Sequence, residues 1–336
     1  MEKRKRNILI IIIALIVSVS IITPLILIFV PFSFGTLKLS QIYTGGMATD
    51  VVVSNEIAYV IDEADQSPGG LVIINVSQNT KPHILGSYLG AGVPWAVDVA
   101  GNIAYVANYF EGLEVINVTD PSNPFKIDQY LGSRCCTDVQ VDGTLAYVAD
   151  WSRGFVILNI SNPTNIEVIS RYEMSGSCVQ FHVYNDIACV LDHYGSYTGL
   201  VILDISNPSH PLEIGSYYLP NVDYWNPFIV ENLIFVGNHA LNGGGLHILD
   251  MNNPLDISQV GFYHGGGSVF AVFIENERAF LADYEKGLIV LDISDTGNPL
   301  KVAQFFDGGH AHDVYIEENI AYVADEEDGL EIVQIL

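Results

Sequence analysis

Short apolar runs separated by turn residues recur along the chain from about residue 36 to its end. An alternating run, such as the one that contains Val51 and Val53, is followed by a Tyr-Val-Ala run, a Leu-Val-Ile run and a Gly-Ser-Tyr run. β-Branched and aromatic residues between Gly, Asn and Pro predict strands, and no helical period is visible after residue 35. The pattern therefore predicts an all-β fold with four strands in each unit.

This unit is repeated seven times at a nearly constant interval. A period in the low forties with four short strands per repeat is typical of a β-propeller. We therefore predict a seven-bladed β-propeller with four antiparallel strands per blade. The Ala-Tyr pair of the second run, or its equivalent, begins at Ala58, Ala104, Ala146, Ala188, Ile234, Ala279 and Ala321, at intervals of 46, 42, 42, 46, 45 and 42 residues.

The two ends of the repeat array indicate how the ring closes. The last unit stops after its third strand, at residues 330–336, whereas residues 37–43 match the fourth strand of other units, such as 212–217. We predict that residues 37–43 pair with 330–335 and complete the last blade, because closure removes an open sheet edge. The propeller then occupies residues 36–336.

Residues 1–35 form a separate segment. Four basic residues at 3–6 precede an almost purely apolar run at 8–34, which as a helix is about 40 Å long, against a bilayer core of about 30 Å. We interpret the run as an uncleaved signal-anchor transmembrane helix with a cytoplasmic basic stub, which places the propeller outside the cell. The alternative is a cleaved signal peptide, and the propeller is exported in either case.

Acidic residues dominate the charge: Asp and Glu number 39 against 13 Lys and Arg, and the formal net charge is −26. A surface of this sign repels phosphate backbones, so nucleic acid is excluded as a partner. Cations, basic peptides and neutral glycans remain compatible with it.

Three stretches carry a family resemblance. Residues 200–209 read LVILDISNPS, residues 288–294 read LIVLDIS, and residues 155–163 read FVILNISNP. They resemble the signature of the LVIVD-repeat family, and the resemblance covers the whole of residues 36–336. It implies a β-propeller of prokaryotic cell-surface or secreted proteins, and it brings no catalytic residue with it. The fifth unit departs from the pattern, with Ile234-Phe235 for Ala-Tyr and Leu255-Asp256 where a second Pro is usual.

Propeller geometry divides the loops between two faces. Links from strand four to strand one and from strand two to strand three share one face, which we call the irregular face because its loops vary in length and sequence. Aromatic residues on loops of a rigid scaffold are typical of binding sites; the alternative is that they fill the funnel and pack on loop glycines. The expected ligand-binding residues are Trp95, Trp151, Trp225, Tyr109, Tyr194, Tyr224 and Tyr284.

The start of each first strand is expected to face the central channel. Five of these seven positions are polar, and such a ring holds ordered water or a cation such as calcium. The five are Asp50, Asp138, Gln180, Asn226 and Asp313, with Ala96 and Ala271 at the other two positions.

His310, His312 and Asp313 form a further candidate site. Two imidazoles two residues apart on an extended segment project to one side and suit zinc or copper, and Asp313 would coordinate the metal or orient a histidine. Chance also produces this spacing often.

Cys136 and Cys178 occupy equivalent positions in neighbouring units. They would form a disulfide in an exported protein if their Cα atoms approach within about 7 Å. The alternative is a pair of free buried thiols.

No hydrolase, phosphate-loop or dinucleotide-binding motif occurs. The first functional hypothesis is a membrane-anchored, cell-surface binding or adhesion module for a cell-envelope glycan, peptide or protein. The second is a metal-dependent hydrolase or lyase at the mouth of the channel. A third is a purely structural envelope protein.

Overall fold

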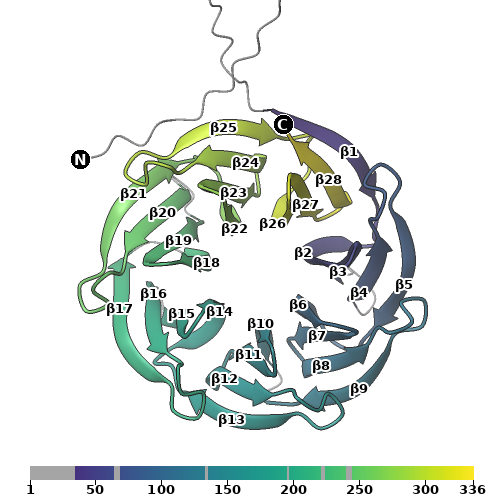
Figure 1. Cartoon of the computed structure of the whole chain (residues 1–336), viewed down its shortest axis with the longest axis horizontal. Helices are drawn as coiled ribbons and strands as arrows, with labels where there is room; N and C mark the ends of the chain where they lie inside the picture. Colours follow the sequence, from purple (N-terminus) through teal and green to yellow (C-terminus); the bar gives the residue numbers. More distant parts are fainter. Residues whose placement is uncertain (1–34, 64–68, 133–134, 195–196, 221–223, 240–243) are drawn as a thin grey trace, which may run out of the picture. The chain divides into compact units, whose positions relative to one another are not determined.

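The computed structural model describes residues 35–63, 69–132, 135–194, 197–220, 224–239 and 244–336. They form seven four-stranded antiparallel sheets, arranged as blades around a central axis (Figure 1). The predicted seven-bladed all-β propeller is therefore confirmed. The predicted transmembrane helix falls on residues outside this description. Within the described ranges, no helix has the length and apolar character needed to cross a membrane.

Each blade contributes one strand to each of four concentric layers, and blades 1 to 7 are numbered from β2 onward. The innermost strands are β2 (Met47–Ser54), β6 (Pro94–Ala100), β10 (Cys136–Asp142), β14 (Ser177–Tyr184), β18 (Tyr224–Val230), β22 (Val269–Glu275) and β26 (Ala311–Glu317). The second strands are β3 (Ile57–Glu63), β7 (Ile103–Asn108), β11 (Leu145–Asp150), β15 (Ile187–Tyr194), β19 (Leu233–Asn238), β23 (Arg278–Asp283) and β27 (Ile320–Asp325). The third strands are β4 (Gly70–Asn75), β8 (Gly112–Asn117), β12 (Gly154–Asn159), β16 (Tyr197–Asp204), β20 (Gly245–Asp250), β24 (Gly287–Asp292) and β28 (Gly329–Ile335). The outermost strands are β5 (His83–Leu89), β9 (Phe125–Tyr130), β13 (Glu167–Tyr172), β17 (Leu212–Pro220), β21 (Ser258–His264), β25 (Leu300–Phe305) and β1 (Thr36–Ile42).

Blade 7 is completed by the first strand of the propeller. Its order is β1-β28-β27-β26, and β1 pairs antiparallel with β28, so that Leu37 lies opposite Gln334 and Ile42 opposite Leu330. This is the pairing expected for residues 37–43. The purple and yellow ends of the propeller thus share one sheet (Figure 1).

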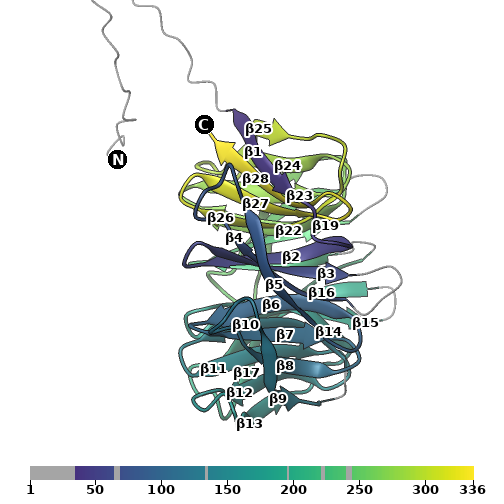
Figure 2. The ribbon, with the colours of Figure 1, turned by 90° about the vertical axis from the view of Figure 1, so that its right-hand side faces the viewer.

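The hydrophobic core lies between the blades. Second strands such as β7 and third strands such as β12 are buried along nearly their whole length, because neighbouring blades cover both faces of each sheet. One core cluster joins Tyr105 and Leu113 of blade 2 with Val139 and Val148 of blade 3. Figure 2 shows the blades edge-on, with their turns at the two faces of the ring.

Candidate functional site

Every innermost strand carries a β-bulge near its first residues. In blade 1, Ala48 lies opposite Asp62 and Asp50 opposite Ile61, so Thr49 is the extra residue. A bulge re-aims side chains and interrupts the strict alternation of a strand. Blade 4 has a wider irregularity between Cys178 and Phe181. The extra residues of the other six blades are Thr49, Trp95, Thr137, Asn226, Phe270 and His312.

These six residues line a cavity of about 140 Å³, which we call the mouth cavity. Residues of all seven blades contribute to its wall. Glu63, at the end of β3, and Trp95, near the start of β6, place the cavity on the irregular face. The five expected polar positions also line it, and they are Asp50, Asp138, Gln180, Asn226 and Asp313.

The polar ring joins neighbouring blades. Asp50 Oδ2 accepts a hydrogen bond from Val97 N of blade 2 at 2.7 Å, and Asp313 Oδ2 accepts one from Val51 N of blade 1 at 3.0 Å. Asp138 Oδ2 and Gln180 Oε1 accept in the same way from the next blade, at 2.9 Å each. Beyond lining a channel, these side chains therefore satisfy backbone donors between innermost strands.

A second polar layer lies two residues further along three innermost strands. Asp98 Oδ2 accepts from Val141 N at 2.7 Å, Gln140 Oε1 from Val183 N at 2.8 Å, and His182 Nδ1 from Ile229 N at 3.1 Å. Sequence analysis missed this layer, although its polar residues stand where blade 1 has the apolar Val52. In blades 5 to 7 aromatic rings take these positions: Phe228, Phe273 and Tyr315, with centroid separations of 5.4 Å.

Burial changes the acidity of these carboxyl groups. Burial raises the pKa of Asp98 to about 6 and that of Asp138 to about 7, although backbone N–H donors oppose the shift in both. Burial and the neighbouring Asp313 raise the pKa of Asp50 well above its usual range, and burial raises that of Asp313. Because the carboxyl groups of Asp50 and Asp313 interact with each other, we expect this pair to retain a proton that isolated aspartates would lose.

The expected aromatic residues divide into groups. Tyr109 lies between Trp95 and Trp151, with ring centroids 6.0 and 6.3 Å away, and the three rings form a cluster over blades 2 and 3 in which only Trp95 lines the mouth cavity. The rings of Trp225 and His312 both contact the ring of Phe270, with centroid separations of 5.3 and 5.0 Å. Trp95 and Trp225 line the cavity itself.

Tyr224 is completely buried and packs edge-on against His247, with ring centroids 5.4 Å apart. The structure thus places Tyr224 in the packing of the sheet and not in the wall of the mouth cavity, because Trp225 lines the cavity and neighbouring residues of a strand point to opposite sides. The side chain of Tyr194 lies outside the described residues.

His310 and His312 are directed to different neighbours. His310 stacks on Tyr284 at 4.3 Å, and its Nδ1 lies 3.5 Å from Glu326 Oε2. His312 stacks on Phe270, and its Nδ1 lies 2.9 Å from the Thr49 carbonyl oxygen. Among the described residues, the two imidazoles belong to no cluster of three metal-ligating side chains.

All four cysteines are described, and all are free thiols. Cys136 and Cys178 are completely buried, and burial together with nearby carboxylates raises the pKa of both thiols. The structure therefore has no Cys136–Cys178 bridge and corresponds to the free-thiol alternative.

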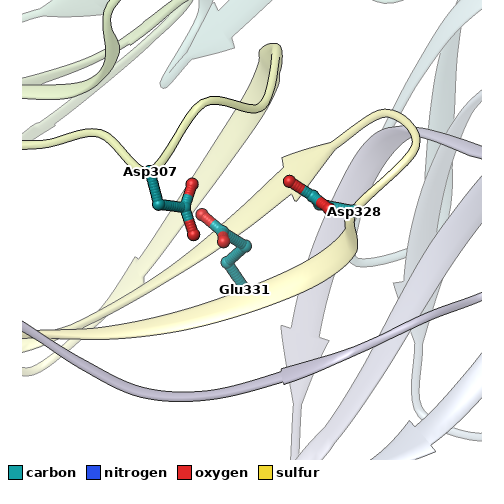
Figure 3. A group of neighbouring side chains, drawn as sticks. All are labelled: Asp307, Asp328 and Glu331. Atoms are coloured by element: carbon teal, nitrogen blue, oxygen red, sulfur yellow. The ribbon is translucent and has the colours of Figure 1, made fainter.

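An acidic cluster lies on the outer side of blade 7. Carboxylate oxygens of Asp307, Asp328 and Glu331 lie within 4.8 Å of one another (Figure 3). Lys38 of β1 donates hydrogen bonds to Asp307 Oδ2 and Glu331 Oε1, so two of the three carboxyl groups already pair with an ammonium group of the chain. We interpret the cluster as a clasp for the closing strand.

The repeat pattern agrees with a family model. The model described as LVIVD repeat matches residues 45–90, 91–131, 133–174, 176–218, 266–305 and 308–335. Blade 5 lies largely outside these matches, but the structure gives it the same four strands, β18 to β21. A comparison with curated proteins gave no match.

Solved structures share the fold at low sequence identity. A chain of a mitotic checkpoint complex is 12% identical with a TM-score of 0.68, covering 96% of this chain and 98% of that one. Sqt1 of Saccharomyces cerevisiae is 9% identical with a TM-score of 0.63, covering 90% and 98%. The computationally designed Ika8 protein is 10% identical with a TM-score of 0.62, covering 89% and 99%. These similarities establish the propeller fold alone. The six family matches together cover more than half of the chain, and the protein therefore belongs to the LVIVD-repeat family.

Proposed function

We propose that the protein is a membrane-anchored binding module whose propeller lies outside the cell and whose ligand docks at the mouth cavity. The observation that carries this proposal is the set of bulges that turn Trp95, Phe270 and their equivalents toward one cavity on the irregular face. Concave sites with aromatic walls and a few convergent polar groups are typical of ligand binding. A cell-envelope glycan, a peptide or a protein loop fits this description.

The location follows from the sequence. A basic cluster at 3–6 and an apolar run at 8–34 predict an anchor with the N-terminus in the cytoplasm. Because β1 begins at Thr36, directly after this run, the anchor continues into the strand that completes blade 7.

Removing the aromatic side chains of the irregular face tests the proposal. We expect the triple variant Trp95→Ala, Trp151→Ala, Trp225→Ala to keep its fold and to lose binding to cell surfaces, glycan arrays or peptide arrays by at least about tenfold, because aromatic anchors carry most interface energy. Phe125→Ala, which removes an exposed ring on the outer strand β9, is the matched control. Unchanged binding by a folded triple variant would refute the proposed site.

Metal analysis separates the enzyme hypothesis from the binding module. Since His310 and His312 contact different neighbours, we expect zinc, copper or calcium in the protein, purified without chelators or a His tag, to be far below one ion per chain. Plasma mass spectrometry provides this measurement. Near-stoichiometric zinc or copper that disappears in His310→Ala/His312→Ala would instead support a metal-dependent hydrolase or lyase.

A further inference from the structure

The walls of the mouth cavity combine negative charge with aromatic rings. Asp50, Glu63, Asp138 and Asp313 are among its described lining residues, and no lysine or arginine is. Trp95, Trp225 and Phe270 are aromatic residues of the same wall. Carboxylates and aromatic faces both attract cations, and the net charge of −26 adds a long-range field of the same sign.

The size of the cavity indicates what kind of cation fits. A cavity of about 150 Å³ accommodates one benzene-sized molecule, and the mouth cavity measures about 140 Å³. In the described part of the chain, its carboxylates do not gather three ligand atoms within 4.8 Å. The space therefore suits a side-chain-sized organic ion better than a bare metal ion.

Two buried polar atoms in the cavity wall have no partner among the described residues. Thr49 Oγ1 and Trp225 Nε1 are both inaccessible to water and make no hydrogen bond. Such atoms normally find partners, because an unpaired buried polar group costs about 1–3 kcal/mol. Because both atoms are closed to water in this structure, a bound group reaches them only if the side chains of the cavity wall move.

We propose that the mouth cavity binds a single organic cation, a guanidinium or primary ammonium group at the end of an arginine or lysine side chain of a peptide or protein partner. This inference rests on the proposed function and names the chemistry that the binding site selects. The charged head contacts the carboxylates of Asp50, Asp138 and Asp313, and its alkyl stem passes between Trp95 and Trp225. The same chemistry is offered by free alkylamines, which the test distinguishes from peptides.

Proton release provides a second signature of this binding. The titratable groups that face the cavity are Asp50, Glu63, Asp138, His312 and Asp313. A bound cation favours the ionised carboxylates, so groups that hold a proton when the cavity is empty release it on binding. The affinity of the mouth cavity for the organic cation therefore rises between pH 6 and pH 8.

Calorimetric titration of the purified full chain tests the proposal. The probes are the N-acetyl methylamides of arginine, lysine and glutamine, together with n-butylammonium. We expect the two cationic amides to bind at least tenfold more tightly than the neutral glutamine amide, and n-butylammonium to bind more weakly than the lysine amide. Heats measured in two buffers of different ionisation enthalpy should differ, because protons are released. Equal binding of cationic and neutral amides would overturn the inference.

Variants locate the site and separate this inference from the proposed function. Asp50→Asn/Asp313→Asn should weaken the arginine amide at least tenfold, whereas Asp204→Asn, on the opposite face, should leave it unchanged. If the double variant does not fold, the comparison of cationic and neutral probes on the wild-type chain still decides. Binding to cells or arrays should depend on the tryptophans, and the arginine amide should compete with it. If the arginine amide does not compete, the proposed cation ligand is refuted and the proposed binding module is not.

Discussion

Lowering the pH from 8 to 5 is expected to raise the contribution of Asp98 and Asp138 to the free energy of unfolding by about 3 kcal/mol. The cause is the buried carboxyl groups between the innermost strands. Asp98 and Asp138 have pKa values of about 6 and about 7, raised by burial from an ordinary value near 3.8. Each pKa unit corresponds to about 1.4 kcal/mol of preference for the protonated form in the folded state.

The sign of the effect follows from proton linkage. A group whose pKa is raised by folding contributes stability that is fully present below the unfolded pKa and is lost as the pH rises through the folded pKa. For these two aspartates the loss runs from about pH 4 to about pH 8, and without discount it amounts to roughly 4 kcal/mol between pH 5 and pH 8. Both side chains are partly exposed. Solvent screening therefore reduces the effect, and we expect about 3 kcal/mol.

Urea denaturation at constant ionic strength between pH 5 and pH 8 measures the effect. Asp138→Asn removes the titrating group and should lose the share of the pH dependence that Asp138 carries. The variant should be less stable than the wild type at pH 5, because the amide nitrogen cannot accept one of the two backbone N–H bonds that Asp138 receives from Val139 and Phe181, so the slopes with pH are compared. Asp204→Asn is the matched control, because it removes one charge from an exposed turn where Asp204 accepts a hydrogen bond from Ser206 N at 2.9 Å. Parallel pH profiles for the two variants would contradict the assignment to Asp138.

The repeat pattern was sufficient to predict the blades, their strands and the closing strand. Each second and third strand is a nearly continuous apolar run because it is buried on both sides, and seven copies of that run leave few alternatives to a closed ring. The polar positions of the channel followed from the alternation of the first strands. Asp50, Asp138 and Asp313 do lie together at the mouth cavity.

The bulges were not predictable from the same alternation. In a regular strand, Thr49 and Asp50 point to opposite sides, as do Trp95 and Ala96, yet the structure places both members of each pair at the mouth cavity. Of the six extra residues only Asn226 is a turn residue, with a φ of 41°. The place of Tyr224 has a different origin: it precedes the bulge and alternates regularly with Trp225, and loop aromatics were assigned by position in the repeat and not by the side to which each ring points.

The clasp of blade 7 depends on a contact that sequence spacing hides. Lys38 and Glu331 are separated by 293 positions and meet only because β1 returns to β28. One signal was present: Glu331 interrupts an apolar run at a position where other blades have Val72, Val156 or Ile289. Blade 2 has a related pair, in which Lys126 Nζ lies 3.2 Å from the buried Glu114.

Removing the ammonium group of Lys38 is expected to destabilise the whole propeller by about 2 kcal/mol or more. Lys38 is the partner of Glu331, whose side chain is 1% exposed, and it also reaches Asp307. Burial and a hydrogen bond with Asp307 already raise the pKa of Glu331 to about 8. Without Lys38, the carboxyl groups face one another with no cation, and loss of one partner from a buried pair is costly.

Lys301→Met is the matched control for Lys38→Met. Lys301 occupies the same position in the outer strand β25 and is hydrogen-bonded to Gln304, as Lys38 is to Gln41. The third strand of the same blade, β24, has Ile289 at the position where β28 has Glu331. We therefore expect Lys301→Met to leave the urea midpoint unchanged, and Lys38→Met to lower it and to speed hydrogen exchange of the β28 amides, which pair with β1.

A double variant separates the ion pair from the packing of β1. Lys38→Met/Glu331→Val replaces both partners by apolar groups and gives blade 7 the residue that blades 1, 3 and 4 already have at that position. Replacing a whole buried pair is often neutral or stabilising, whereas breaking it is not. We expect the double variant to recover most of the stability that Lys38→Met loses. If the two variants are equally unstable, the alkyl stem of Lys38 stabilises β1 and its charge does not, and the clasp is then a packing contact.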